Sequence, residues 1–148
     1  MSAAPGRSQA SSHRSPQGEG TPVSTAITPL PWPVSSASSL SKPLVDHRIY
    51  TITLRKMPEF LDVFNRLAMP ILMQTLGHPV GFYTSLVGPQ NQFVHLWAYE
   101  GLADYERRCQ ARDTHPDFPA YLQASAHLIT AQETRLIRAV QMPGWRPA

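Results

Sequence analysis

The sequence predicts an α+β fold over residues 44–141, with the element order β-α-β-β-α-β and a four-stranded antiparallel sheet. Two observations carry this prediction. Four segments are rich in β-branched and aromatic residues, which favours strands. Two longer segments between them space their apolar residues three and four positions apart, as amphipathic helices do. The remaining parts are an N-terminal tail, residues 1–43, and a C-terminal tail, residues 142–148.

The N-terminal tail differs in composition from everything after it. Residues 1–43 hold eleven serines and seven prolines but few aliphatic residues. Such a segment cannot bury enough apolar surface to offset the entropy of ordering it, so we expect it to be disordered. Its serines and early arginines resemble an organelle transit peptide, but its prolines would interrupt the amphipathic helix that such a peptide forms. We therefore favour a natural extension or an upstream coding start over a targeting segment.

The first strand and the first helix follow the tail. A run of β-branched and aromatic side chains predicts the strand at residues 45–54. Pro58 suits the first turn of a helix, and the apolar positions after it recur at helical spacing. Pro70 lies inside this helix and lacks the N–H that would bond one turn back, so it should kink the helix near Arg66. Gly77 is expected to end the helix.

A β-hairpin is expected next, with strands at residues 80–87 and 92–99 joined by a turn at residues 88–91. The second of these strands carries no charge on either face. One face presents Phe93, His95, Trp97 and Tyr99, and the other presents Val94, Leu96 and Ala98. Such a strand must be covered on both sides, so we expect both faces of the sheet to be buried.

The second helical region is expected at residues 102–113, with a break at His115-Pro116 and a continuation over residues 120–131. Residues 132–140 then form the last strand. This order is the ferredoxin-like split pattern, which places both helices on one face of the sheet. Because the strands are apolar on both faces, we expect a second copy to cover the other face in a two-fold symmetric homodimer.

Charge and composition exclude several classes of protein. Nine basic and nine acidic residues balance between Val45 and Val140, so the net charge of +3 belongs to the tails. A nucleic-acid binder needs a clustered basic face, which this domain lacks. No apolar run approaches the ~20 residues of a membrane span, and the start has no secretory apolar region. The single cysteine, Cys109, fits a reducing compartment, and we expect a cytoplasmic location.

His95 is the best candidate for a catalytic residue, because it is the one histidine on an aromatic strand face. A neutral imidazole there could act as a general base near pH 7. The alternative is a core histidine that hydrogen-bonds a neighbouring group. The other histidines show no metal-ligand spacing, so we expect no metal site. The chain also lacks phosphate-binding, dinucleotide-binding and serine-nucleophile motifs, and we expect no cofactor.

Four further residues are candidates for binding a ligand. Arg48 lies on an otherwise buried strand and must find an acceptor, either an anionic ligand or a structural carboxylate such as Glu133. Tyr50, Tyr83 and Trp97 are amphipathic aromatics that could line a pocket or fill the core.

Several of these residues resemble the motifs of the NIPSNAP family. The segments are Arg48-x-Tyr50-Thr51, Pro58-Glu59-Phe60, Gly88-Pro89-x-Asn91-Gln92-x-Val94-His95-Leu96-Trp97-x-Tyr99, Tyr121-Leu122 and Gln132-Glu133. The resemblance covers residues 45–140 and implies a dimeric α+β barrel, related by fold to small cofactor-free oxygenases and haem-degrading proteins. The chain departs from the family pattern twice. Leu86 stands where the family usually has an acidic residue, and Tyr105 where it often has an arginine.

Three functions are therefore open. The first is a homodimer that binds a small molecule, anionic or aromatic, in a pocket between sheet and helices. The second is a non-catalytic structural or protein-interaction module, since fold alone does not decide function. The third, implied by the resemblance, is a cofactor-free oxygenase- or isomerase-like enzyme. A cavity of about 300 Å³ or more, lined by Arg48, His95 and Trp97, would favour the first.

Overall fold

The computed structural model describes residues 42–140 and 142–144. The predictions for residues 1–41 lie outside the described residues. Four antiparallel strands form one sheet in the order β2-β3-β1-β4. They are β1 (Leu44–Ile52), β2 (Pro79–Thr84), β3 (Gln92–Tyr99) and β4 (Ile129–Arg138).

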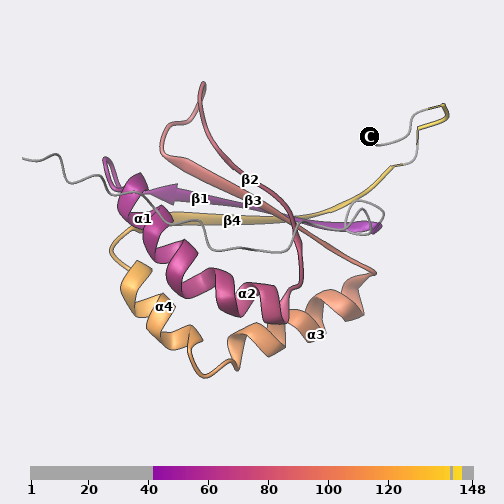
Figure 1. Cartoon of the computed structure of the whole chain (residues 1–148). Helices are drawn as coiled ribbons and strands as arrows, with labels where there is room; N and C mark the ends of the chain where they lie inside the picture. The colour runs from indigo at the N-terminus through magenta and orange to yellow at the C-terminus, as the bar shows by residue number, and fades with distance from the viewer. Residues whose placement is uncertain (1–41, 141, 145–148) are drawn as a thin grey trace, which may run out of the picture.

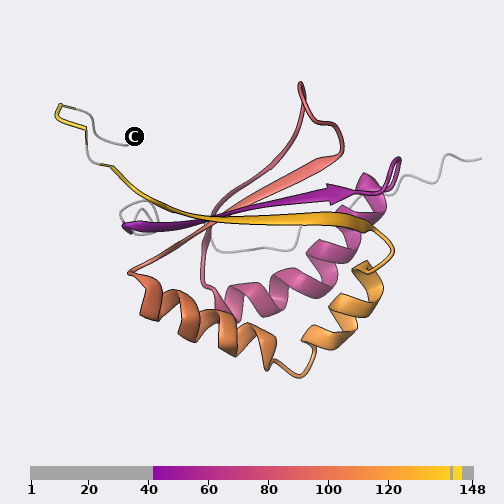
Figure 2. The ribbon, with the colours of Figure 1, turned by 180° about the vertical axis from the view of Figure 1, so that it is seen from behind.

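The helices all lie on one face of this sheet, as the two opposite views show (Figures 1 and 2). They are α1 (Met57–Val63), a π-helical turn η2 (Phe64–Ala68), α2 (Met69–Thr75), α3 (Leu102–Asp113) and α4 (Phe118–Ser125). The predicted α+β fold with ferredoxin-like β-α-β-β-α-β order is therefore confirmed. The single chain does not test the homodimer.

A kink was predicted near Arg66, and the helix is distorted there into the π-helical turn η2. Pro70 has no N–H to donate to the carbonyl of Arg66, so the normal α-helical bond at this point is missing. The N–H of Met69 bonds the carbonyl of Phe64 instead, five residues back. The helix ends at Gly77, as predicted. Its φ of 88° is a left-handed conformation that glycine adopts with little steric strain.

The core lies between the sheet and the helices. Phe93, His95, Trp97 and Tyr99, which were expected on one face of β3, are all buried in this core. Aromatic rings from α1, η2 and β2 pack against that face. Phe60 and Phe64 from the first helical segment contact the Phe93 ring at centroid distances of 5.1 and 5.0 Å. Phe82 from β2 stacks on the same ring at 5.9 Å. This aromatic cluster fixes the helices over the centre of the sheet.

The opposite face of the sheet carries apolar side chains without a described helix over them. Ile49 pairs with Val94 across β1 and β3, and Val45 pairs with Ala98. Val45, Ile49 and Val94 are only half-buried in the single chain. We call the side of the sheet that carries these three residues the open face.

The boundaries of the last helix and strand were predicted wrongly. The helix was expected over residues 120–131, but α4 starts at Phe118, because Pro119 is tolerated in a first turn, and it ends at Ser125. The N–H of Leu128 closes a turn onto the Ser125 carbonyl at 2.9 Å, and β4 begins at Ile129 rather than at residue 132. Strand β2 also ends earlier than expected, at Thr84, which leaves Leu86 and Val87 in an exposed loop.

Candidate functional site

A cavity of about 150 Å³ lies between the sheet and the helices. Arg48, Tyr50, His95 and Gln132 line it from the sheet. The helical side contributes Phe64, Leu72, Leu76, Arg112, Asp113, Phe118, Tyr121, Leu122 and Ser125. A shallower depression adjoins it and shares Leu122, Ser125 and Gln132 with the cavity lining. A small molecule could therefore enter between α4 and β4.

The structure places three of the five predicted ligand-binding residues on this cavity and two elsewhere. Trp97 is wholly buried and does not line it, and Tyr83 pairs with Val94 toward the open face and is half-exposed. The cavity is also only half of the roughly 300 Å³ that would favour a ligand site. A cavity of this volume suits a small ligand and is too small for a typical cofactor.

His95 lies at the centre of the sheet, opposite Arg48 on β1 and Phe82 on β2. Its side chain is 98% buried, with the Tyr50 ring edge-on at 4.7 Å and the Phe93 ring stacked at 5.4 Å. The indole Nε1 of Trp97 donates to its Nδ1 at 2.8 Å. Because an indole N–H can only donate, Nδ1 is the acceptor and the ring proton is on Nε2.

The Nε2 atom of His95 has no hydrogen-bond partner among the described residues, although it is buried. Burial lowers the pKa of His95 to about 3, and the positive charges of Arg48 and Arg112 contribute to this shift. The ring is therefore neutral at pH 7. This geometry gives His95 the role of a hydrogen-bond donor and makes it a weak general base, since its one lone pair already accepts from Trp97.

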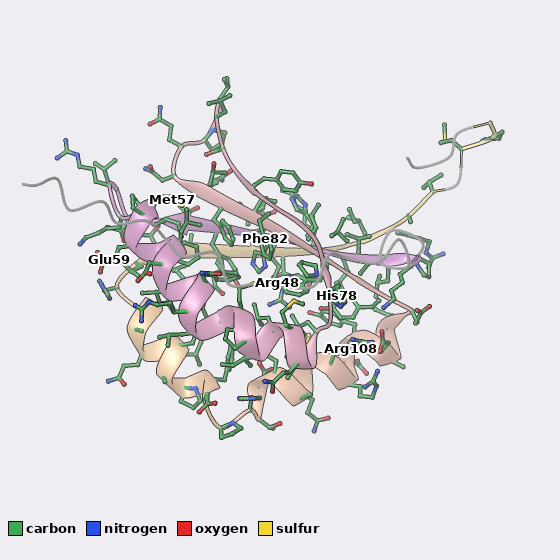
Figure 3. All side chains as sticks on the ribbon, viewed as in Figure 1. Arg48, Met57, Glu59, His78, Phe82 and Arg108 are labelled. Atoms are coloured by element: carbon green, nitrogen blue, oxygen red, sulfur yellow. The ribbon has the colours of Figure 1, made fainter. Side chains whose placement is uncertain are left out.

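Arg48 forms a buried ion pair with Asp46, two residues earlier on the same strand face. Its Nε donates to Asp46 Oδ2 at 2.7 Å (Figure 3 shows where Arg48 lies between sheet and helices). Burial opposes the guanidinium charge, but Asp46 outweighs it and raises the pKa of Arg48 above its ordinary value. The carboxylate suggested from the sequence, Glu133, pairs with Arg135 instead. The alternation of β1 could have identified Asp46, since residues two apart share a face.

Two residues from the helices, Arg112 and Tyr121, add unpartnered polar atoms to the lining. Arg112 of α3 donates from Nε to Asp113 at 2.8 Å, and its guanidinium lies over the Phe118 ring, 5.5 Å from the centroid. Its Nη1 is buried without a partner among the described residues, as is the hydroxyl of Tyr121 on α4. Burial raises the pKa of Tyr121 above its ordinary value, so the hydroxyl keeps its proton. Sequence reasoning missed Arg112, because nothing in a polar helix singles out the arginine that faces the sheet.

The two departures from the family pattern fall outside the cavity. Leu86 is 96% exposed in the loop between β2 and β3. Tyr105 packs edge-on against Tyr99 with ring centroids 5.3 Å apart, away from the cavity lining. Within residues 42–140 and 142–144, no three His, Cys, Asp or Glu side chains gather to hold a metal ion. None of the helices in this part of the chain is long and apolar enough to cross a membrane.

The NIPSNAP family model matches residues 45–143, which is most of the chain. The protein belongs to the NIPSNAP family. Solved NIPSNAP structures agree with this assignment. A NIPSNAP family protein of unknown function from Agrobacterium tumefaciens is 25% identical with a TM-score of 0.65, over 70% of this chain and 93% of that one. A NIPSNAP-like domain protein from Burkholderia xenovorans is 30% identical with a TM-score of 0.63, over 70% and 89% of the two chains.

The NIPSNAP fold extends to more distant proteins. SnoaB, a cofactor-independent oxygenase from Streptomyces nogalater, is 19% identical with a TM-score of 0.50, over 71% of this chain and all of that one. At this identity the likeness concerns the fold alone. The chain has no significant match among curated proteins.

Proposed function

We propose that this NIPSNAP protein is a homodimer that binds a small molecule in the cavity between sheet and helices. The unpartnered Nε2–H of His95 is the observation that carries the proposal. Leaving a buried donor without an acceptor costs about 1–3 kcal/mol. Protein cores seldom retain such a donor unless water or a ligand reaches it, and here the donor borders a cavity.

The open face supports the proposed dimer. Valine and isoleucine side chains there are half-buried in the single chain, and β3 carries no charge on this side. A second copy packed face to face would remove these side chains from water at about 25 cal/mol per Å² of apolar area. The cavity lies on the other face of each sheet, so the two copies would bind independently.

The alternative of a purely structural module predicts no ligand. His95 does not support the enzyme alternative. Its proton lies on Nε2, and the lone pair of Nδ1 already accepts a hydrogen bond from Trp97, so neither nitrogen is available as a general base. We therefore propose binding without assigning a reaction.

A fragment screen by protein-observed NMR tests the binding proposal, with neutral and charged fragments in separate pools. Ser125→Leu adds a side chain to the cavity lining, whereas Gln123→Leu adds the same side chain to the exposed surface of the same helix. We expect fragments that bind the parent and Gln123→Leu but not Ser125→Leu. A folded parent protein that binds no fragment of either charge would leave the structural module as the function.

A further inference from the structure

We propose that the cavity ligand is a small monocarboxylate with an apolar body, whose carboxylate oxygens accept hydrogen bonds from His95 Nε2 and Arg112 Nη1. This inference rests on the proposed function and names the chemical class of its ligand. It follows from three properties of the cavity: its unpartnered donors, its charge and its apolar walls.

The unpartnered polar atoms of the cavity are mainly donors. His95 Nε2 and Arg112 Nη1 can only donate, and the Tyr121 hydroxyl can donate or accept. A ligand that satisfies them must bring acceptors. A carboxylate brings two oxygens with about four lone-pair sites, and a hydrogen bond from arginine to it is charge-assisted.

The charges around the cavity favour an anion at His95. Arg48 and Arg112 both line the cavity and both lower the pKa of His95, so the potential at its ring is positive. Two carboxylates balance these two guanidinium groups. However, Asp46 is not part of the lining, and Asp113 already accepts from Arg112 with its own side chain half-exposed. Both guanidinium groups therefore line the cavity, whereas of the two carboxylates only Asp113 does, and it is already paired with Arg112.

Apart from the charged residues, Ser125 and Gln132, the rest of the lining is leucine and aromatic side chains, which specifies the body of the ligand. Leucine and aromatic side chains from the helices and Tyr50 from the sheet surround the remaining space. A volume of about 150 Å³ admits a short aliphatic chain or a single ring. A second charge on the ligand would lose its hydration against these walls, and the other lining guanidinium, Arg48, is already paired with Asp46, so a monoanion fits better than a dianion.

Benzoate and its neutral isostere benzamide test the proposal by isothermal titration calorimetry at matched ionic strength. They share a ring and differ in charge and acceptors. We expect benzoate to bind at least about tenfold more tightly, the difference that one charge-assisted hydrogen bond supplies. Arg112→Gln should lower benzoate affinity by about ten- to a hundredfold. Arg107→Gln is the matched control, since Arg107 is exposed on the same helix and does not line the cavity, and it should change nothing.

Two substitutions at His95 separate its two ring nitrogens. His95→Asn places an acceptor near the Nδ1 position for Trp97 but removes the donor at Nε2, whereas His95→Gln reaches the Nε2 position with an amide donor. We expect benzoate to bind His95→Gln more tightly than His95→Asn. Circular dichroism melts check that both variants fold, and Arg112→Gln decides the question if they do not.

The outcomes distinguish this inference from the proposed function. Equal affinity for benzoate and benzamide, or benzoate binding unchanged in Arg112→Gln, would overturn the carboxylate and leave small-molecule binding standing. Failure of benzoate together with success of neutral fragments would have the same meaning. If no fragment binds, both proposals are wrong.

Discussion

On the helix side of β3, Phe93, His95 and Trp97 are almost wholly buried, whereas Val94 and Leu96 on the opposite side stay partly exposed in the single chain. The two sides have the same uncharged character in the sequence. They differ in what covers them, because the connections of the ferredoxin-like order place every described helix on one side (Figure 2). One face is therefore covered within the described residues, and the other is open in the single chain.

The largest expected effect is on the helix side, from Trp97→Asp. Trp97 is fully buried and donates to His95, so the variant loses a large apolar side chain and buries a charge. We expect the domain to unfold, since losing the indole alone costs about 3–5 kcal/mol and the charge adds to it. Circular dichroism should show no cooperative thermal transition. A folded variant would mean that the helix side is less tightly packed than the structure has it.

Arg48→Met should destabilise the same side by about 3–5 kcal/mol, because it leaves the carboxylate of Asp46 buried without its partner. The double variant Arg48→Met with Asp46→Leu is the control. It removes both charges and should recover most of the loss, as measured by urea denaturation. A single variant as stable as the parent would show that Asp46 is readily protonated or solvated in the folded protein.

Val94→Asp probes the open face and should act on association more than on folding. Val94 is half-buried in the single chain, so the charge can stay in water in a monomer but not between two sheets. We expect light scattering to report a dimer for the parent and a folded monomer for the variant, with at least ~2 kcal/mol lost from dimerisation. A parent monomer, or a stable dimer of the variant, would mean that this face is not the interface.

The contrast between the two faces also explains what the sequence could predict. Alternation along β3 correctly placed His95 and Trp97 on one face, and Pro70 correctly located the helix distortion near Arg66. Contacts between residues on different strands or helices were harder to predict from the sequence. Alternation cannot separate Trp97, which fills the core, from His95, which borders the cavity, because that depends on where the helices above them pack. The pairing of Arg48 with Asp46 rather than Glu133 depends on the register of β4, which places Glu133 opposite Ile49 on the other face of the sheet.

The smallest expected effect concerns the pH dependence of stability, which reports whether His95 is held neutral. Its pKa is about 3 in the folded protein, against about 6.5 in an unfolded chain. Between these values the unfolded state binds the extra proton, so stability falls as the pH drops from 6.5 toward 3, by up to about 1.4 kcal/mol per pH unit. His95→Gln should lower stability at pH 7 by only about 1 kcal/mol, since a single hydrogen bond to Trp97 is at stake.

The variant should also flatten the loss of stability on acidification, so its difference from the parent should shrink and then reverse below about pH 6. Urea denaturation of both proteins between pH 7 and pH 4 measures this, and subtracting the two curves removes the contribution of shared carboxylates. His127→Gln is a suitable control, because His127 is an exposed histidine that contacts Glu59. Parallel curves for the parent and His95→Gln would show that the imidazole titrates freely, and the neutral donor assigned to the cavity would then be wrong.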